Sequence, residues 1–239
     1  MIKPSLLTRC FALVVVFWLG VLGSAHAFSD QSVLKGFNRT VFGSEFAGFG
    51  LQANYVRRFE RTVRFYIHHT SRKNRRPAVR RFIRSLRSSI RGLRTQIVTN
   101  PRSANFHVYI VDRSQYGKTI RDQIYRSRSA PVRGRCMVRA RFTRGGITRS
   151  DAVIVSDEGE SLFRRCLVEE ILQGLGPLNE HSSLTASVFN DASTHTSFTR
   201  FDRLILNMLY DKRVRSGDSP RKVQPLLPAL LKTAKRRVR

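Results

Sequence analysis

The chain has 239 residues, with 44 Lys and Arg against 16 Asp and Glu, and a formal net charge of +28. No stretch beyond the first 27 residues is apolar enough to span a membrane as a helix. So strong a positive charge implies attraction to polyanions such as nucleic acid, anionic lipid headgroups, lipopolysaccharide or acidic wall polymers.

The N-terminus has the order of features found in a secretory leader. Lys3 and Arg9 precede an apolar run of 13 residues, Cys10 to Leu22, and small residues follow at Ala25 and Ala27. The run is shorter than the roughly 20 residues that a membrane span needs. We predict a signal peptide over residues 1–27 and export to the periplasm or beyond. Its removal leaves 42 basic and 16 acidic residues, a net charge of +26, and no cysteine at the new terminus for a lipid anchor.

The rest of the chain is predicted to be one α+β domain. Residues 28–49 form an N-terminal helical segment, 50–231 the main domain with a mixed sheet, and 232–239 a frayed basic tail. The patterns predict, in order, a helix over 29–41, a strand over 62–68, a helix over 77–98 and a strand over 105–112. On these strands His68 and His107 fall on the polar side of the alternation and are expected to face solvent.

The predicted helix over 77–98 carries two stripes. An apolar stripe repeats at intervals of four and three residues, and beside it runs a row of guanidinium groups: Arg80, Arg84, Arg87, Arg91 and Arg94. The row is interpreted either as a solvated face of a very basic protein or as a specific polyanion site. No helix-turn-helix, zinc-finger or RNA-binding signature favours nucleic acid, and the leader argues against it inside the cell.

The second half of the chain begins with a polar segment, 114–128, that is predicted to be partly helical. A hairpin then spans 136–142 and 147–155, and Gly145 and Gly146 are expected to supply positive φ angles at its turn. Helices are predicted over 160–175, over 199–211 with Thr199 as its cap, and from 219 to 231; residues 177–197 read as an irregular loop.

Two cysteines remain after the leader, Cys136 and Cys166. In an oxidising compartment an isolated pair usually bonds, and a bridge here would join the hairpin to the next helix. By the chain-entropy estimate it would stabilise the fold by roughly 3 kcal/mol. The alternative is two separate buried thiols.

The helix over 160–175 has the spacing of a zinc-peptidase helix, H-E-x-x-H-x-x-G-x-x-H, in which two histidines four residues apart and a third beyond the glycine bind zinc. The corresponding positions read Glu169, Glu170, Gln173, Gly176 and Asn179. The general-base glutamate, Glu170, and the turn glycine are retained, whereas all three ligand positions have changed.

These residues resemble the C-terminal half of a metzincin-type zinc peptidase. The altered motif is followed by Ser187 to Asp191, where Val188 or Phe189 would stand at the position of the turn methionine, and then by Thr199 to Asp211, which opens with a Thr-x-x-Asp capping pattern. The resemblance implies a zincin-like fold. Over residues 50–231 the chain more closely resembles secreted bacterial proteins of the domain-of-unknown-function family numbered 2927, which implies fold and compartment and no activity.

Three hypotheses follow for the function of the protein: a non-catalytic binding module, an unconventional hydrolase and a nucleic-acid-binding protein. Glu169, Gln173 and Asn179 could form a hydrogen-bonded cluster that fastens the helix to the loop, in a non-catalytic binding module of the cell envelope. The site could also be a shallow groove that still binds a peptide or glycan. They could instead hold zinc or calcium, although amides are weak zinc ligands and no cofactor is expected. His181 and His195 could supply a displaced metal site together with Glu169, in an unconventional hydrolase with Glu170 as base. The third hypothesis is an extracellular nucleic-acid-binding protein. The sequence leaves the oligomeric state open.

Overall fold

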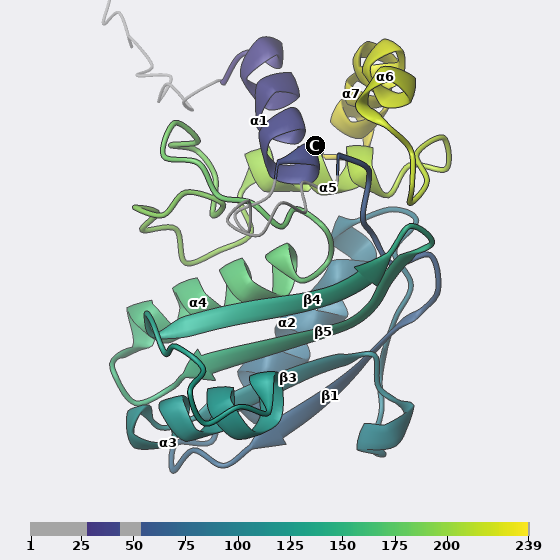
Figure 1. Ribbon diagram of the computed structural model, residues 1–239. Coiled ribbons are helices and arrows are strands. Elements are labelled where there is room, and N and C mark those ends of the chain that lie inside the picture. The colour runs from purple at the N-terminus through teal and green to yellow at the C-terminus, as the bar shows by residue number, and fades with distance from the viewer. Residues whose placement is uncertain (1–27, 44–53, 239) are drawn as a thin grey trace, which may run out of the picture.

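The computed structural model describes residues 28–43 and 54–238 (Figure 1). The predicted leader and the predicted segment boundary at 49/50 lie outside these residues. The fold is α+β and contains a five-stranded mixed sheet in the order β2-β1-β3-β5-β4. Neighbouring strands are parallel except for the edge strand β4, which runs antiparallel to β5. The strands are β1 (Val63–His69), β2 (Thr95–Ile97), β3 (Phe106–Val111), β4 (Cys136–Thr143) and β5 (Gly146–Val155).

Helices cover both faces of the sheet. On one face α2 (Arg76–Ser89) and α4 (Glu160–Gln173) pack against the inward side chains of the strands, as the alternation Val63, Phe65, Ile67 predicts (Figure 1). On the other face, α3 (Arg113–Thr119) and its π-helical continuation, Ile120–Tyr125, enclose a smaller apolar cluster. The segment 114–128 is therefore largely helical.

Helix α2 is shorter than the sequence pattern predicts. It ends at Ser89, and residues 95–97 form β2 instead of a last helical turn. The chain leaves the helix at Gly92, whose φ is +94°, and Asn207 binds both sides of the break: its amide donates to the Ser89 carbonyl and its Oδ1 accepts from the Arg91 backbone N–H. The prediction of one helix over 77–98 was wrong because tertiary hydrogen bonds end the helix within an unbroken apolar repeat.

The hairpin between β4 and β5 is confirmed, with one difference at its turn. Only Gly146 has a positive φ, +124°, and a Cβ there would lie 2.7 Å from the Arg58 carbonyl oxygen. Gly145 does not share this conformation, so the expectation of two positive φ angles was wrong. Near this turn, the pairing of β4 with β5 shifts register between Arg141 and Phe142, as at a β-bulge.

The remaining helices gather beyond one end of the sheet (Figure 1). Among them, α1 and α7 pack on α5, most of whose side chains are buried. The bounds are α1 (Asp30–Phe42), α5 (Arg200–Leu209), α6 (Pro220–Val223) and α7 (Leu227–Arg237), with short 3₁₀ turns at Pro101–Ser103 and Gln224–Leu226. Ser29 caps α1 and Thr199 caps α5, as the sequence indicates.

The basic C-terminal segment is helical as far as Arg237 and is not frayed. Arg237 lies 3.4 Å from Asp211, and Lys235 pairs with Asp30 of α1. Ala234 and Val238 are buried, which anchors the last turn. Within the described residues, no helix is both long and apolar enough to cross a bilayer.

Candidate functional site

The altered motif lies on α4, which packs along β4 and β5. Glu169, Glu170 and Gln173 are all buried, at 4%, 4% and 5% exposure, so the motif faces the interior of the protein. The helix ends at Gly174, and Gly176 turns the chain with a φ of +142°. A Cβ at Gly176 would lie 2.4 Å from the Arg57 carbonyl oxygen, so the turn requires glycine, as the motif predicts.

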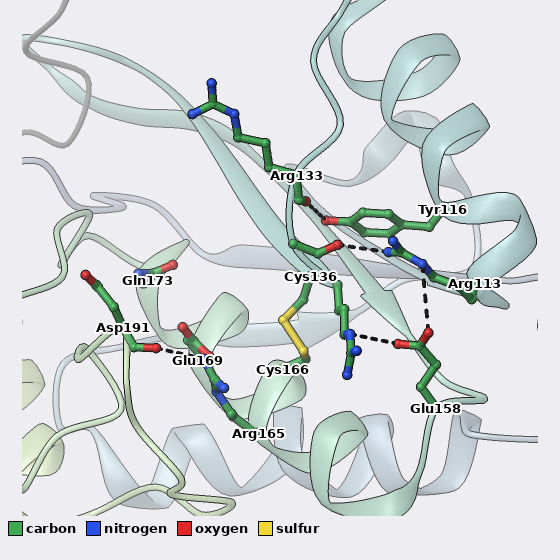
Figure 2. The surroundings of a disulfide bond; sticks show 12 residues. Arg113, Tyr116, Arg133, Cys136, Glu158, Arg165, Cys166, Glu169, Gln173 and Asp191 are labelled. Atoms are coloured by element: carbon green, nitrogen blue, oxygen red, sulfur yellow. Dashed lines mark hydrogen bonds and ion pairs between the residues drawn. A yellow bond between two sulfur atoms is a disulfide. The ribbon is translucent and has the colours of Figure 1, made fainter.

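Two of the altered positions meet Glu180, a loop residue whose contact with the motif helix the sequence pattern does not indicate. The Gln173 amide donates to the Glu180 carboxylate at 2.5 Å, and Glu169 shares a hydrogen bond with Glu180. Burial raises the pKa of Glu169, against the opposing effects of Glu180 and Arg165. Arg165 approaches Glu169 at 3.2 Å and donates to the Asp191 carbonyl at 3.3 Å (Figure 2). The group ties α4 to the following loop.

The third altered position points elsewhere. The Asn179 amide donates to the carbonyls of Arg39 and Thr40, at 3.2 and 3.0 Å, in the last turn of α1. Asn179 therefore satisfies carbonyl groups at a helix C-terminus. The polar cluster of α4 is thus formed by Glu169, Gln173 and Glu180, and Asn179 is not part of it.

The Cys136–Cys166 disulfide is confirmed, and it joins β4 to α4 beside the motif (Figure 2). Atoms of Cys136, Glu169 and Glu170 lie within 4.8 Å of one another, a spacing compatible with metal ligands. The cysteine sulfur is consumed in the disulfide, however, and Glu169 already pairs with Arg165. Glu169 is engaged by Arg165, and Gln173 and Asn179 could offer only neutral amide oxygens, which are weak ligands for zinc.

The two loop histidines are engaged in local contacts. His181 Nδ1 accepts from the Ser183 backbone N–H at 3.1 Å, and His195 Nε2 lies 3.0 Å from the Thr185 carbonyl. In the described part of the chain, neither joins Glu169 in a three-ligand group. The hypothesis of a displaced metal site at these residues is not supported.

The turn after the motif is organised by Asp202, which sequence analysis treated only as part of a capping pattern. Its carboxylate accepts from the Ser187 hydroxyl, the Val188 backbone N–H and the Thr199 hydroxyl, at 2.5, 3.2 and 2.6 Å. Asp202 is fully buried, and burial raises its pKa to about 6. It thereby fixes the irregular loop to the start of α5.

The predicted arginine row is divided between two places. Arg80, Arg84 and Arg87 lie on α2, and no described acidic residue pairs with them. Arg80 and Arg84 border a shallow depression of about 540 Å³, together with Asn74, Arg76, Pro77 and Arg81. Arg91 and Arg94 follow the helix break and line a different pocket, so the expectation of one continuous row was wrong.

His107 was expected to face solvent but is 4% exposed. Its Nδ1 lies 3.0 Å from His68 Nε2, and Tyr109 stacks on His68 with ring centres 4.2 Å apart. Asp151, beside His107 on β5, is fully buried and binds Arg149 at 2.6 Å. Burial lowers the pKa of His68 to about 4, and His107 and Arg149 act in the same direction.

A comparison with protein families matches residues 30–229, which include every element from β1 to α6 and the whole altered motif. The chain belongs to the family described as "Protein of unknown function (DUF2927)". Proteins with curated descriptions give no significant match.

Proposed function

We propose that the protein is an exported, non-catalytic binding module that attaches to anionic polymers or lipid headgroups of the cell envelope through the arginine face of α2. Support comes from the distribution of charge on this helix. Residues 76–89 include Arg76, Arg80, Arg81, Arg84 and Arg87 and no acidic residue. Guanidinium groups are planar donors suited to phosphate and sulfate oxygens.

The packing of α2 supports a role for this face in binding. Val79, Ile83 and Leu86 are buried in the core, which leaves the guanidinium side free to meet a partner without disturbing the fold. The shallow depression bordered by Arg80 and Arg84 suits an extended polymer lying across the surface better than a small enclosed ligand.

We further propose that the α4 region is a zincin-like site that has lost its chemistry. The Glu-Glu-x-x-Gln-x-x-Gly-x-x-Asn spacing, the Gly176 turn and the Ser187 turn fixed by Asp202 support this relationship. The contacts of the altered ligand positions favour a structural role: Gln173 binds Glu180, and Asn179 binds the end of α1.

The anionic-polymer proposal is tested by salt-dependent binding to immobilised heparin and to lipopolysaccharide. Replacing Arg80, Arg84 and Arg87 with Gln should weaken binding about tenfold or more. It should also reduce the dependence of binding on salt, because a variant that makes fewer phosphate or sulfate contacts releases fewer counterions when it binds.

The matched control replaces Arg121, Arg128 and Arg133 with Gln. These exposed residues lie around α3, and the change removes the same charge from another face. Equal weakening by both variants would mean that net charge alone controls binding and would contradict a role for α2. Nucleic acid of matched charge density, used as competitor, separates an extracellular nucleic-acid-binding protein from the proposed module.

The catalytic alternative has its own test. If the protein is an unconventional hydrolase, Glu170→Gln should abolish turnover of peptide or glycan substrates with the fold intact. Under our proposal, the same substitution changes only stability, because Glu170 is buried beside the disulfide.

A further inference from the structure

A second basic site lies on the structure, away from the α2 face. It is a pocket of about 440 Å³ formed where four segments meet: the irregular segment preceding β1, the turn between α2 and β2, the chain that follows α5, and the end of α7. Seven basic side chains and one carboxylate, Glu60, line it among the described residues. The helix break at Gly92 creates this pocket, because it turns Arg91 and Arg94 away from the α2 stripe.

The turn that carries these arginines is held in place by the core. Gly92 approaches the chain after α5 so closely that a Cβ would lie 2.4 Å from the Tyr210 carbonyl oxygen. Asn207 fixes the preceding residues, with hydrogen bonds of 2.8 and 3.0 Å to Ser89 and Arg91. Leu93, between the two arginines, is 4% exposed and anchors the turn. The backbone positions of Arg91 and Arg94 are therefore set before any ligand arrives.

One side of the pocket is a fixed ion pair. Arg58 is buried, binds Glu60 through two hydrogen bonds of 2.9 and 3.0 Å, and donates to the Leu209 carbonyl at 2.8 Å. Burial raises the pKa of Glu60, but hydrogen bonds from Arg58 and Ser216 outweigh it and hold the pKa at about 2. Glu60 thus stays ionised and is already occupied by Arg58, with Arg215 at 3.5 Å.

Arg237 pairs with Asp211, but the four remaining cations in the pocket lack such partners among the described residues. In residues 28–43 and 54–238, no carboxylate lies within ion-pair distance of Arg61, Arg91, Arg94 or Lys212, and all four are exposed. Several unpaired cations gathered in one concave site repel one another, and the curvature focuses their field. A ligand with several negative groups would relieve this repulsion.

We propose that this pocket binds a compact ligand with two or more phosphate groups, such as a pyrophosphate group, through Arg91, Arg94 and neighbouring cations. The site is independent of the α2 face: it is concave, built on a fixed framework and suited to a small multiply charged group. The ligand could be a free phosphorylated compound or the phosphorylated headgroup of a lipid.

Isothermal titration calorimetry with sodium pyrophosphate tests the proposal on the chain without its predicted leader. We expect binding that an Arg91→Gln/Arg94→Gln variant weakens about tenfold or more, since a loss of about 1.4 kcal/mol is tenfold in Kd. Both side chains are exposed and lack ion-pair partners, so the variant should fold, which circular dichroism checks.

The control is Arg80→Gln/Arg84→Gln, which removes the same charge from α2 and should change the affinity less than about twofold. Equal weakening by the two variants, or no binding of pyrophosphate by the wild-type protein at low millimolar concentration, would overturn the proposal. The same two residues, with Arg87, are replaced in the heparin test of the α2 proposal. The pocket variant and the α2 variant therefore test the two proposals separately, and one proposal can fail while the other holds.

Co-sedimentation with vesicles identifies the source of the phosphate groups. Vesicles of phosphatidylcholine with cardiolipin, a lipid that carries two phosphate groups, are compared with phosphatidylcholine alone. Loss of vesicle binding in the Arg91/Arg94 variant supports a headgroup ligand, whereas pocket-dependent binding of pyrophosphate alone supports a soluble one. Vesicle binding and pyrophosphate binding that are both unaffected by the variant would refute the site.

Discussion

Removing the Cys136–Cys166 disulfide should destabilise the protein substantially without changing the binding face on α2. The perturbation is the double substitution Cys136→Ala/Cys166→Ala. The cysteines are 30 residues apart, and the chain-entropy estimate for a loop of this length gives about 3.5 kcal/mol at 25 °C. Cys166 is fully buried among apolar side chains, so trimming it adds a packing loss. We expect the free energy of unfolding to fall by about 3–5 kcal/mol.

Urea unfolding followed by far-UV circular dichroism measures this loss. Circular dichroism is preferred to fluorescence because the one tryptophan, Trp18, lies in the predicted leader. The wild-type protein in reductant should approach the stability of the variant, and the variant should not respond to reductant. A stability difference below about 1 kcal/mol would refute the argument that the bridge restricts the unfolded chain around α4. Unchanged heparin binding by the folded variant is expected, because α2 packs on the sheet apart from the bridge.

Two other predictions concern the helix break and the pair formed by His68 and His107. Asn207→Ala should lower the free energy of unfolding by about 1–2 kcal/mol in urea titrations, because it removes the hydrogen bonds to the half-buried Ser89 carbonyl and to the Arg91 N–H. A loss under about 0.5 kcal/mol would contradict the assignment of the break to this side chain. The pKa of His68 is lowered to about 4 in the folded protein, against 6.5 in the unfolded chain. Protonation of His68 therefore favours unfolding, and the free energy of unfolding falls as the pH drops from about 6.5 toward about 4. Allowing for its partial exposure, His68→Gln should recover about 1–2 kcal/mol at pH 4.5 relative to pH 7, and equal pH dependence in variant and wild type would show that burial, His107 and Arg149 do not hold His68 neutral.

The sequence by itself determined the elements whose signals are local. Alternation in Val63 to His68 specified a strand buried on one side, and the Thr199 and Asp202 pattern specified the start of α5. The hairpin, the turn at Gly176 and the disulfide also followed from the sequence, since a glycine turn or an isolated cysteine pair has few alternatives.

Only the tertiary structure decided where α2 ends and what the polar residues contact. The apolar repeat continues through Ile97 and conceals the break; Gly92 is the one local sign of it. The hydrogen bonds that stabilise the break come from Asn207, more than 100 residues further along the chain. His107 falls on the polar side of its strand by alternation, yet packing over that face buries it.

The same limit applies to both candidate sites. Glu180 and Asn179 are adjacent in sequence, but Glu180 turns to α4 and Asn179 to α1. Arg61, Arg91 and Lys212 meet in one pocket although long stretches of chain separate them. Periodicity reports which face of an element is apolar, whereas side-chain partners are set by how distant elements pack, and that information is spread over the whole chain.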